Sequence, residues 1–106
     1  MKIKKINRIY KPSPKSKPIK DCARISLSTN EQVTFLSHGS NYDFCKKSWG
    51  FYASPSINQR LINEGFSCYL IKNKHKKKYF VVVNNSKKNM FKNFLLKTKH
   101  KVIKSL

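Results

Sequence analysis

Acidic residues are scarce in this chain of 106 residues, which has 4 Asp and Glu against 24 Lys and Arg. The carboxylates of Asp21, Glu31, Asp43 and Glu64 are widely spaced along the sequence, so chemistry by paired carboxylates is not indicated. No apolar run approaches the ~18 residues that a membrane-spanning helix needs. These shortages point away from a carboxylate-based hydrolase and from a membrane span. The length fits one small domain with a tail.

Cysteine is also sparse, and Cys22, Cys45 and Cys68 cannot all form disulfides with one another. There is no C-x-x-C pair, and Cys45 with His38 would need a further ligand to hold a metal. The sequence therefore predicts reduced structural thiols, no metal, no cofactor and no catalytic residue. The N-terminal residues alternate Lys and Ile without an apolar core, so we expect no secretory signal and a cytoplasmic location.

Basic charge dominates what is present, with a formal net charge of +20. Such a charge attracts polyanions, and the expected partners are nucleic acid or another anionic ligand such as a sugar phosphate. A second interpretation remains open, in which the lysine excess reflects an AT-rich genome and solubility rather than binding. Lys, Asn and Ile together occupy 40 of the 106 positions, and their codons are AT-rich. Only three of the basic residues are Arg, the side chain that grips phosphate with two parallel donors.

Residues 1–21 read as a disordered basic arm, because three prolines and many lysines leave little apolar surface to bury. Residues 22–106 are expected to form the folded domain. Within it, Glu31–Ser37 alternates as a strand and His38-Gly39-Ser40-Asn41 reads as a turn. The aromatic segment 42–53 fits either an irregular stretch or a second strand.

The clearest helix signal covers Pro55–Glu64, with Ser54 as its N-cap and Gly65 as the left-handed residue after its end. Further along the chain we expect a hairpin of Ser67–Lys72 and Lys78–Val83, whose second strand is apolar on both faces and therefore central. Asn85 or Ser86 is expected to cap a second helix with an apolar stripe, and a last strand covers Lys101–Leu106.

The order strand, helix, strand, strand, helix, strand predicts an α+β domain with the ferredoxin-like βαββαβ fold. Such a sheet leaves one face open, built from parts of Tyr79–Val83 and Glu31–Ser37. Residues 42–51, the N-terminal arm or a second copy in a homodimer are the candidates to cover it.

The entry to the first expected helix is the most informative candidate site. A helix N-terminus offers free N–H groups to an anion, and hydroxyl, guanidinium and aromatic side chains cluster there in sequence. The expected ligand-binding residues are Trp49, Tyr52, Ser54, Ser56 and Arg60. An ordinary capped helix after an aromatic core segment is the alternative interpretation of the same residues.

A second candidate is the loop of the expected hairpin, where Lys74, Lys76, Lys77 and Lys78 suit non-specific binding of a polyanion. A solvated loop is the plainer interpretation. The strand that follows lacks the Gly and the second aromatic of the RNA-recognition signature, so stacking of that type is not indicated.

From Cys22 onward the chain resembles a family of small uncharacterised bacterial proteins. The resemblance is carried by Cys22-Ala-Arg-Ile, Glu31-Gln-Val-Thr-Phe, and above all Trp49-Gly-Phe-Tyr-Ala-Ser-Pro-Ser-Ile-Asn, followed by Gly65-Phe66. It implies a setting near surface-polysaccharide, sugar and methyltransferase functions, and no activity for any residue. We therefore expect a non-enzymatic accessory protein with an anion site at the helix entry. The alternative is an RNA-binding protein, for example one associated with the ribosome.

Overall fold

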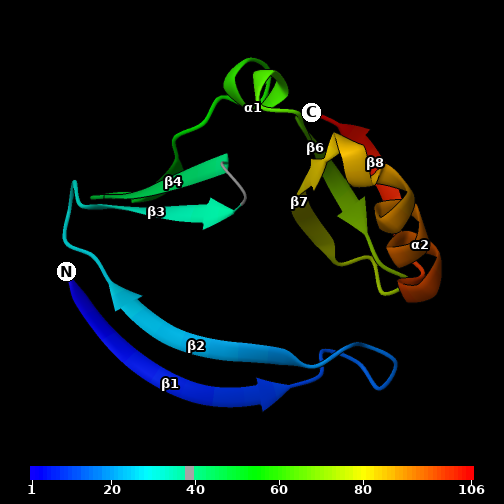
Figure 1. Cartoon of the computed structure of the whole chain (residues 1–106), viewed down its shortest axis with the longest axis horizontal. Helices are drawn as coiled ribbons and strands as arrows, with labels where there is room; N and C mark the ends of the chain where they lie inside the picture. Colours follow the sequence, from blue (N-terminus) through cyan, green and yellow to red (C-terminus); the bar gives the residue numbers. More distant parts are fainter. Residues whose placement is uncertain (38–39) are drawn as a thin grey trace. The chain divides into compact units, whose positions relative to one another are not determined.

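A computed structural model describes residues 1–37 and 40–106. In these residues eight β-strands form three separate antiparallel sheets, and two α-helices are present (Figure 1). The predicted ferredoxin-like α+β fold is therefore wrong, because the chain is mostly β. The chain divides into two compact units, Met1–Ser54 and Pro55–Leu106.

The strands of the first unit are β1 (Lys2–Tyr10), β2 (Ile19–Ser26), β3 (Gln32–Ser37), β4 (Ser40–Lys47) and β5 (Gly50–Ala53). The elements of the second unit are α1 (Arg60–Asn63), β6 (Phe66–Lys72), β7 (Lys78–Asn84), the 3₁₀ turn η1 (Asn85–Lys87), α2 (Lys88–Thr98) and β8 (Lys101–Ser105).

The N-terminal segment forms a β-hairpin of β1 and β2, so the prediction of a disordered arm over residues 1–21 is wrong. β1 pairs antiparallel with β2 from Lys2 opposite Ser26 to Tyr10 opposite Ile19, with one register shift. The alternating Lys and Ile residues suit an extended strand once a partner supplies its backbone hydrogen bonds. The predicted boundary between residues 21 and 22 lies inside β2. The prolines that argued for disorder lie in the connection between the two strands.

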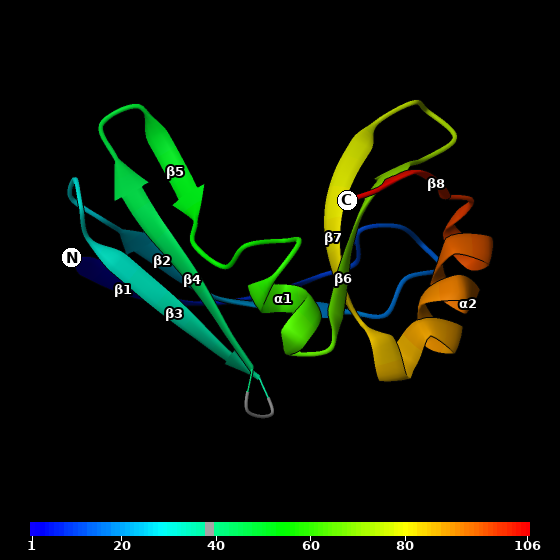
Figure 2. The same ribbon diagram turned by 90° about the horizontal axis from the view of Figure 1, so that it is seen from above.

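The second sheet is a meander in which β4 lies between β3 and β5 (Figure 2). The predicted strand Glu31–Ser37 is confirmed as β3, and segment 42–53 forms most of β4 and all of β5. Ser48 and Trp49 make the tight turn between them, where Gly50 takes a φ of 145°. The predicted turn at His38 and Gly39 lies outside the described residues.

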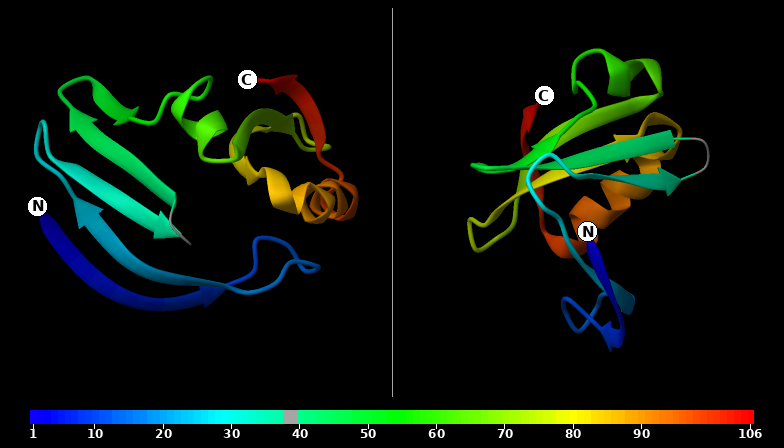
Figure 3. Two further views of the ribbon diagram at one scale, coloured as in Figure 1. Left: turned by 45° about the horizontal axis from the view of Figure 1, so that its top comes forward. Right: turned by 90° about the vertical axis from the view of Figure 1, so that its left-hand side faces the viewer.

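The third sheet has the order β7-β6-β8, and α2 crosses one of its faces (Figure 3). The predicted hairpin is confirmed, with β6 antiparallel to β7, and the predicted last strand is confirmed as β8. The central strand is β6 rather than β7, which corrects the prediction. β7 lies at an edge, and its Tyr79 and Phe80 are about half exposed.

The second predicted helix is confirmed as α2, although its start differs. Asn84 is the residue that caps, and its side-chain oxygen accepts the N–H of Ser86 as η1 begins. Phe91 of α2 stacks on Tyr69 of β6, with ring centroids 5.6 Å apart, which holds the helix on the sheet. No helix among the described residues has the length and apolar character needed to cross a membrane.

The first predicted helix, Pro55–Glu64, is much shorter than the sequence suggests. Only Arg60–Asn63 is α-helical, and turns precede it. Gly65 does adopt the predicted left-handed conformation, with a φ of 86°. A ferredoxin-like sheet would need the strand at 32–37 between the strands at 78–84 and 101–105, but those strands belong to a different sheet.

Candidate functional site

The aromatic residues predicted at the helix entry lie on the β4–β5 hairpin. Trp49 is 70% exposed in its tight turn, and Tyr52 on β5 is opposite Cys45 of β4. Ser54 continues this sheet, because its N–H donates to the carbonyl of Asp43 over 2.9 Å. Ser54 does not have the predicted role of N-cap, because the helix begins only at Arg60 and its N-cap position is Gln59.

The other two predicted residues belong to the second unit, and they contact each other. The hydroxyl of Ser56 accepts the backbone N–H of Arg60, the first residue of the short helix, over 2.8 Å, while Gln59 holds the N-cap position without a side-chain capping bond. The guanidinium Nε of Arg60 lies 3.6 Å from a carboxylate oxygen of Glu64, one turn further on. Both groups that were expected to hold an anion thus have partners within the protein.

Asp21 is the centre of an ion-pair cluster on the β1–β2 hairpin. Its two carboxylate oxygens lie 2.7 Å from Arg24 and 3.1 Å from Arg8. The hydrogen bond from Arg24, together with that from Arg8, lowers the pKa of Asp21. Two of the three arginines are therefore engaged with the same carboxylate.

The remaining carboxylates are engaged as well. Glu31 accepts the backbone N–H of Ser28 over 2.7 Å and pairs with the N-terminal ammonium of Met1 over 3.0 Å, and these contacts lower its pKa. Asp43 accepts the hydroxyl hydrogen of Thr34 over 2.8 Å. With Glu64 paired to Arg60, all four Asp and Glu side chains have partners, and none of the ion pairs among residues 1–37 and 40–106 involves a lysine.

The lysines therefore keep their charge without a protein counter-ion: in residues 1–37 and 40–106, no lysine forms an ion pair with a carboxylate. There are 21 lysines in the sequence. Because such charges repel one another when no counter-ion is near, an extended anion is the partner that relieves the most repulsion. Lysines occur in both compact units.

The β6–β7 loop places the four predicted polyanion-binding lysines on an ordered turn. The side-chain oxygen of Asn73 accepts the backbone N–H groups of His75 and Lys77 over 2.9 and 3.0 Å. Backbone bonds between Asn73 and residues 76 and 77 close the loop, and Lys76 takes a left-handed φ of 63°. Lys74, Lys76 and Lys77 lie exposed on this loop, and Lys78 is exposed as the first residue of β7.

The cysteines differ in their surroundings. All three are free thiols, with Cys22 exposed, Cys45 half-buried and Cys68 fully buried on β6. Burial raises the pKa of the Cys68 thiol. No group of three or more His, Cys, Asp or Glu residues suited to a metal ion occurs in the described part of the chain.

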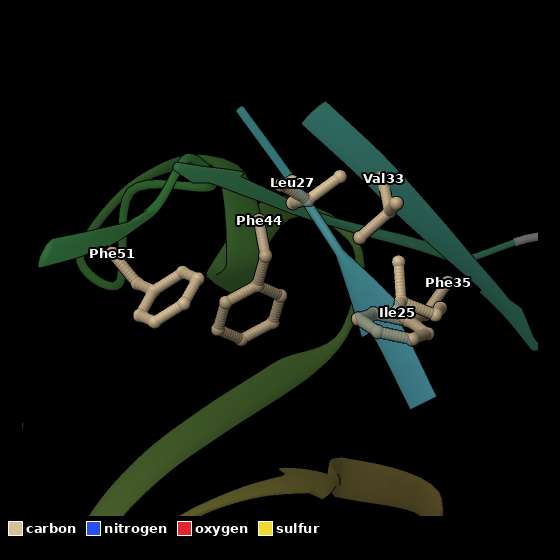
Figure 4. A pocket seen from close by; sticks show the side chains of 6 residues that line it. All are labelled: Ile25, Leu27, Val33, Phe35, Phe44 and Phe51. Carbon is tan, nitrogen blue, oxygen red and sulfur yellow. The ribbon is translucent and has the colours of Figure 1, made fainter. Parts of the chain in front are cut away.

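An apolar hollow of about 380 Å³ in the first unit was missed by sequence reasoning (Figure 4). The side chains that line it come from β2 and its C-terminal end, β3, β4 and β5, and they are Ile25, Leu27, Val33, Phe35, Phe44 and Phe51. The alternation of Val33 and Phe35 was a signal for one apolar face. The strands that complete the hollow, however, were not assigned from the sequence.

Comparison of the chain with protein-family models, with curated proteins and with solved structures gives no match.

Proposed function

We propose that this protein is a non-enzymatic nucleic-acid-binding protein that holds the phosphate backbone with its lysines. The observation that carries the proposal is that the protein's four Asp and Glu side chains contact groups other than lysine in the described residues. Asp21 and Glu64 pair with the arginines, and Glu31 pairs with the N-terminus. A phosphate chain would then supply the counter-charges that the protein's own carboxylates do not give to the lysines.

Because the arginines are paired with carboxylates and the lysines are not, among the described residues, we expect little preference for particular nucleotide sequences. The three guanidinium groups, which form the paired donors best suited to phosphates and base edges, are engaged with carboxylates. Lysine ammonium groups act as point charges and contact phosphates without reading bases. Binding should therefore be strongly dependent on salt and similar for different sequences.

The β4–β5 hairpin supports nucleic acid over other polyanions. Trp49 protrudes at its turn next to Lys46 and Lys47, and Phe51 lies under the Lys46 ammonium at 5.7 Å. Exposed aromatic rings beside cations stack on the bases of single strands, and each stacked base contributes about 1–3 kcal/mol. A polysaccharide offers no base for this contact.

Three earlier expectations stay predictions: the sugar-phosphate site at the helix entry, the link to surface polysaccharide, and the cytoplasmic location. The four-residue α1 and the engaged Ser56 and Arg60 give the small-anion site no added support. The expected homodimer face also changes, because Tyr79–Val83 and Gln32–Ser37 belong to different sheets.

The test is a binding titration of fluorescently labelled single-stranded RNA with the full chain in increasing salt. Affinity should fall steeply between about 50 and about 200 mM salt, since bound lysines release counter-ions from the strand. Emission of Trp49, the single tryptophan in the sequence, should be quenched on binding if its ring stacks on a base. An acidic polysaccharide in parallel should bind with a similar salt dependence but without quenching.

Two variants of equal charge separate a binding loop from diffuse charge. Replacing Lys74, Lys76, Lys77 and Lys78 by Gln should lower the slope of log affinity against log salt by about 3, for four lost phosphate contacts. The control replaces Lys11, Lys15, Lys17 and Lys20 by Gln, and its slope should change less. Failure of the wild-type chain to bind RNA at low salt would refute the proposed function.

A third variant, Asn73→Ala, keeps the net charge and removes the side-chain acceptor that orders the loop. If the ordered conformation of the loop contributes to RNA binding, the affinity of Asn73→Ala for RNA falls although its net charge is that of the wild-type chain. If affinity is unaltered, charge alone accounts for the contribution of the loop.

A further inference from the structure

One face of the β3-β4-β5 sheet carries three phenylalanine rings, one from each strand. Val33 pairs with Phe44, Phe44 pairs with Ala53, and residues directly opposite in antiparallel strands point to the same side. Because side chains alternate along a strand, Phe35 and Phe51 share the side of Phe44. The rings of Phe35, Phe44 and Phe51 are 50%, 38% and 67% exposed. We call these three rings the phenylalanine face.

The rings of the phenylalanine face adjoin one another in the apolar hollow. Phe35 and Phe44 meet edge to face, with ring centroids 5.7 Å apart, and the ring of Phe51 lies beside that of Phe44 (Figure 4). Ile25 from β2 lies near Phe35, and none of the six side chains that line the hollow is charged. An exposed apolar patch marks an interaction site, and rigid rings offer flat π-surfaces to a ligand.

Positive charge adjoins the phenylalanine face at its β5 end. Lys46 lies opposite Phe51, and its ammonium is 5.7 Å from the centre of that ring. The ammonium donates to the carbonyl of Lys47, and because an ammonium has three donors it can contact a phosphate as well. The carboxylate of Asp43 lies on the opposite face of the sheet, where it accepts the hydroxyl hydrogen of Thr34. The face therefore suits a ligand that combines flat rings with negative charge.

We propose that the phenylalanine face is a stacking platform for the unpaired bases of a single-stranded nucleic acid, an inference that rests on the proposed function. The bases supply flat rings, and the phosphates supply the counter-charge for Lys46. A lipid chain or an uncharged protein surface would leave that ammonium without a counter-charge. Bases in a duplex are stacked on one another and cannot reach the rings, so the platform favours single strands over duplexes.

The experiment compares Phe51→Leu and Phe35→Leu with the wild-type full chain by titration of three labelled probes. The probes are an unstructured single-stranded RNA, a duplex RNA of the same sequence, and inorganic polyphosphate. Leucine keeps an apolar side chain and the net charge but removes the ring. Each variant should bind the single strand at least about fivefold more weakly, because stacking on one ring is lost. The slope of log affinity against log salt should not change, because no phosphate contact is removed.

The duplex and polyphosphate present no unpaired base, so both variants should bind them as the wild-type chain does. The matched control is Phe80→Leu on β7, whose ring is 52% exposed, close to that of Phe35, but belongs to a different sheet. It should bind all three probes with wild-type affinity. Far-UV circular dichroism checks that each variant folds. If Phe35→Leu does not fold, Phe51→Leu on the edge strand β5 carries the test.

The outcomes separate this proposal from the proposed function. Unaltered binding of the single strand by Phe51→Leu would overturn the stacking platform and leave the proposed function in place, and it would mean that something other than bases covers the face. An equal loss of affinity for the duplex or for polyphosphate, or an equal loss in Phe80→Leu, would overturn the platform as well. Failure of the wild-type chain to bind any of the three probes at low salt would refute the proposed function, and the platform with it.

Discussion

The second unit depends on a very small core, and Ile71 is the residue that tests this most directly. Ile71 lies on the central strand β6, opposite Tyr79 of β7 and Val102 of β8, and is 1% exposed. The change Ile71→Val removes one buried carbon and should cost about 1 kcal/mol of the free energy of unfolding. The change Ile71→Ala should cost about 3 kcal/mol.

These costs are large for a unit of this size. At about 0.05–0.15 kcal/mol per residue, a unit of about 50 residues has a stability of about 3–8 kcal/mol. A urea m-value of about 1 kcal/mol/M converts the loss in Ile71→Val into a midpoint about 1 M lower. Ile71→Ala should lower the midpoint by about 3 M and leave about 0–5 kcal/mol of stability.

The assay is urea denaturation of the full chain, followed by the helical far-UV circular dichroism signal of α2. The matched control is Ile103→Val on β8 of the same sheet, where the side chain is 44% exposed and the loss should be less than half as large. Equal midpoint shifts for the two variants would refute the assignment of Ile71 to the core.

Three further predictions concern local contacts. Ser56→Ala should lower stability by about 1 kcal/mol because it removes the acceptor of the Arg60 N–H, whereas the Ser54 hydroxyl has no such role at the helix; thermal melts of both variants compare them. A thiol reagent should label Cys22 quickly and Cys68 only on unfolding, because Cys68 is buried with a raised pKa; mass spectrometry after timed labelling measures this. The pKa of Asp21 is lowered by folding, so its stabilisation of the β1–β2 hairpin is present above the unfolded pKa and is lost as pH falls through the folded pKa. Amide chemical shifts of β1 should therefore change on acidification below about pH 4, and Asp21→Asn should remove that dependence.

Local sequence patterns predicted the β6–β7 hairpin, α2 and β8 of the second unit, but not its short α1 or its central strand. The β-branched run of β7 and the polar loop before it predicted the β6–β7 hairpin, and the apolar stripe before residue 98 predicted α2. Gly65 was placed correctly because the left-handed backbone conformation that follows a helical turn favours glycine, which has no Cβ. These features depend on neighbours within a few residues, which a sequence displays directly.

The candidate site was predicted only in part. The lysines of the β6–β7 loop were identified from their run in the sequence, and they are exposed as expected. The helix-entry site was inferred from a cap at Ser54, but Ser54 continues the β4–β5 sheet through its N–H bond to Asp43, and the helix begins only at Arg60. Contacts with another strand thus decided where the helix does not begin.

The sequence by itself determined the net charge, the excess of lysine over arginine, and the positions of several strands and of α2. The tertiary structure decided which strands pair: it paired the expected arm with β2 as β1, and it placed β3 in a different sheet from β7 and β8. It also decided that the arginines pair with the few carboxylates and that the aromatic rings of β3, β4 and β5 share one open face. The physical reason is that alternation along a strand fixes which side chains share a face, while its hydrogen-bonding partner is selected by segments far away in the chain.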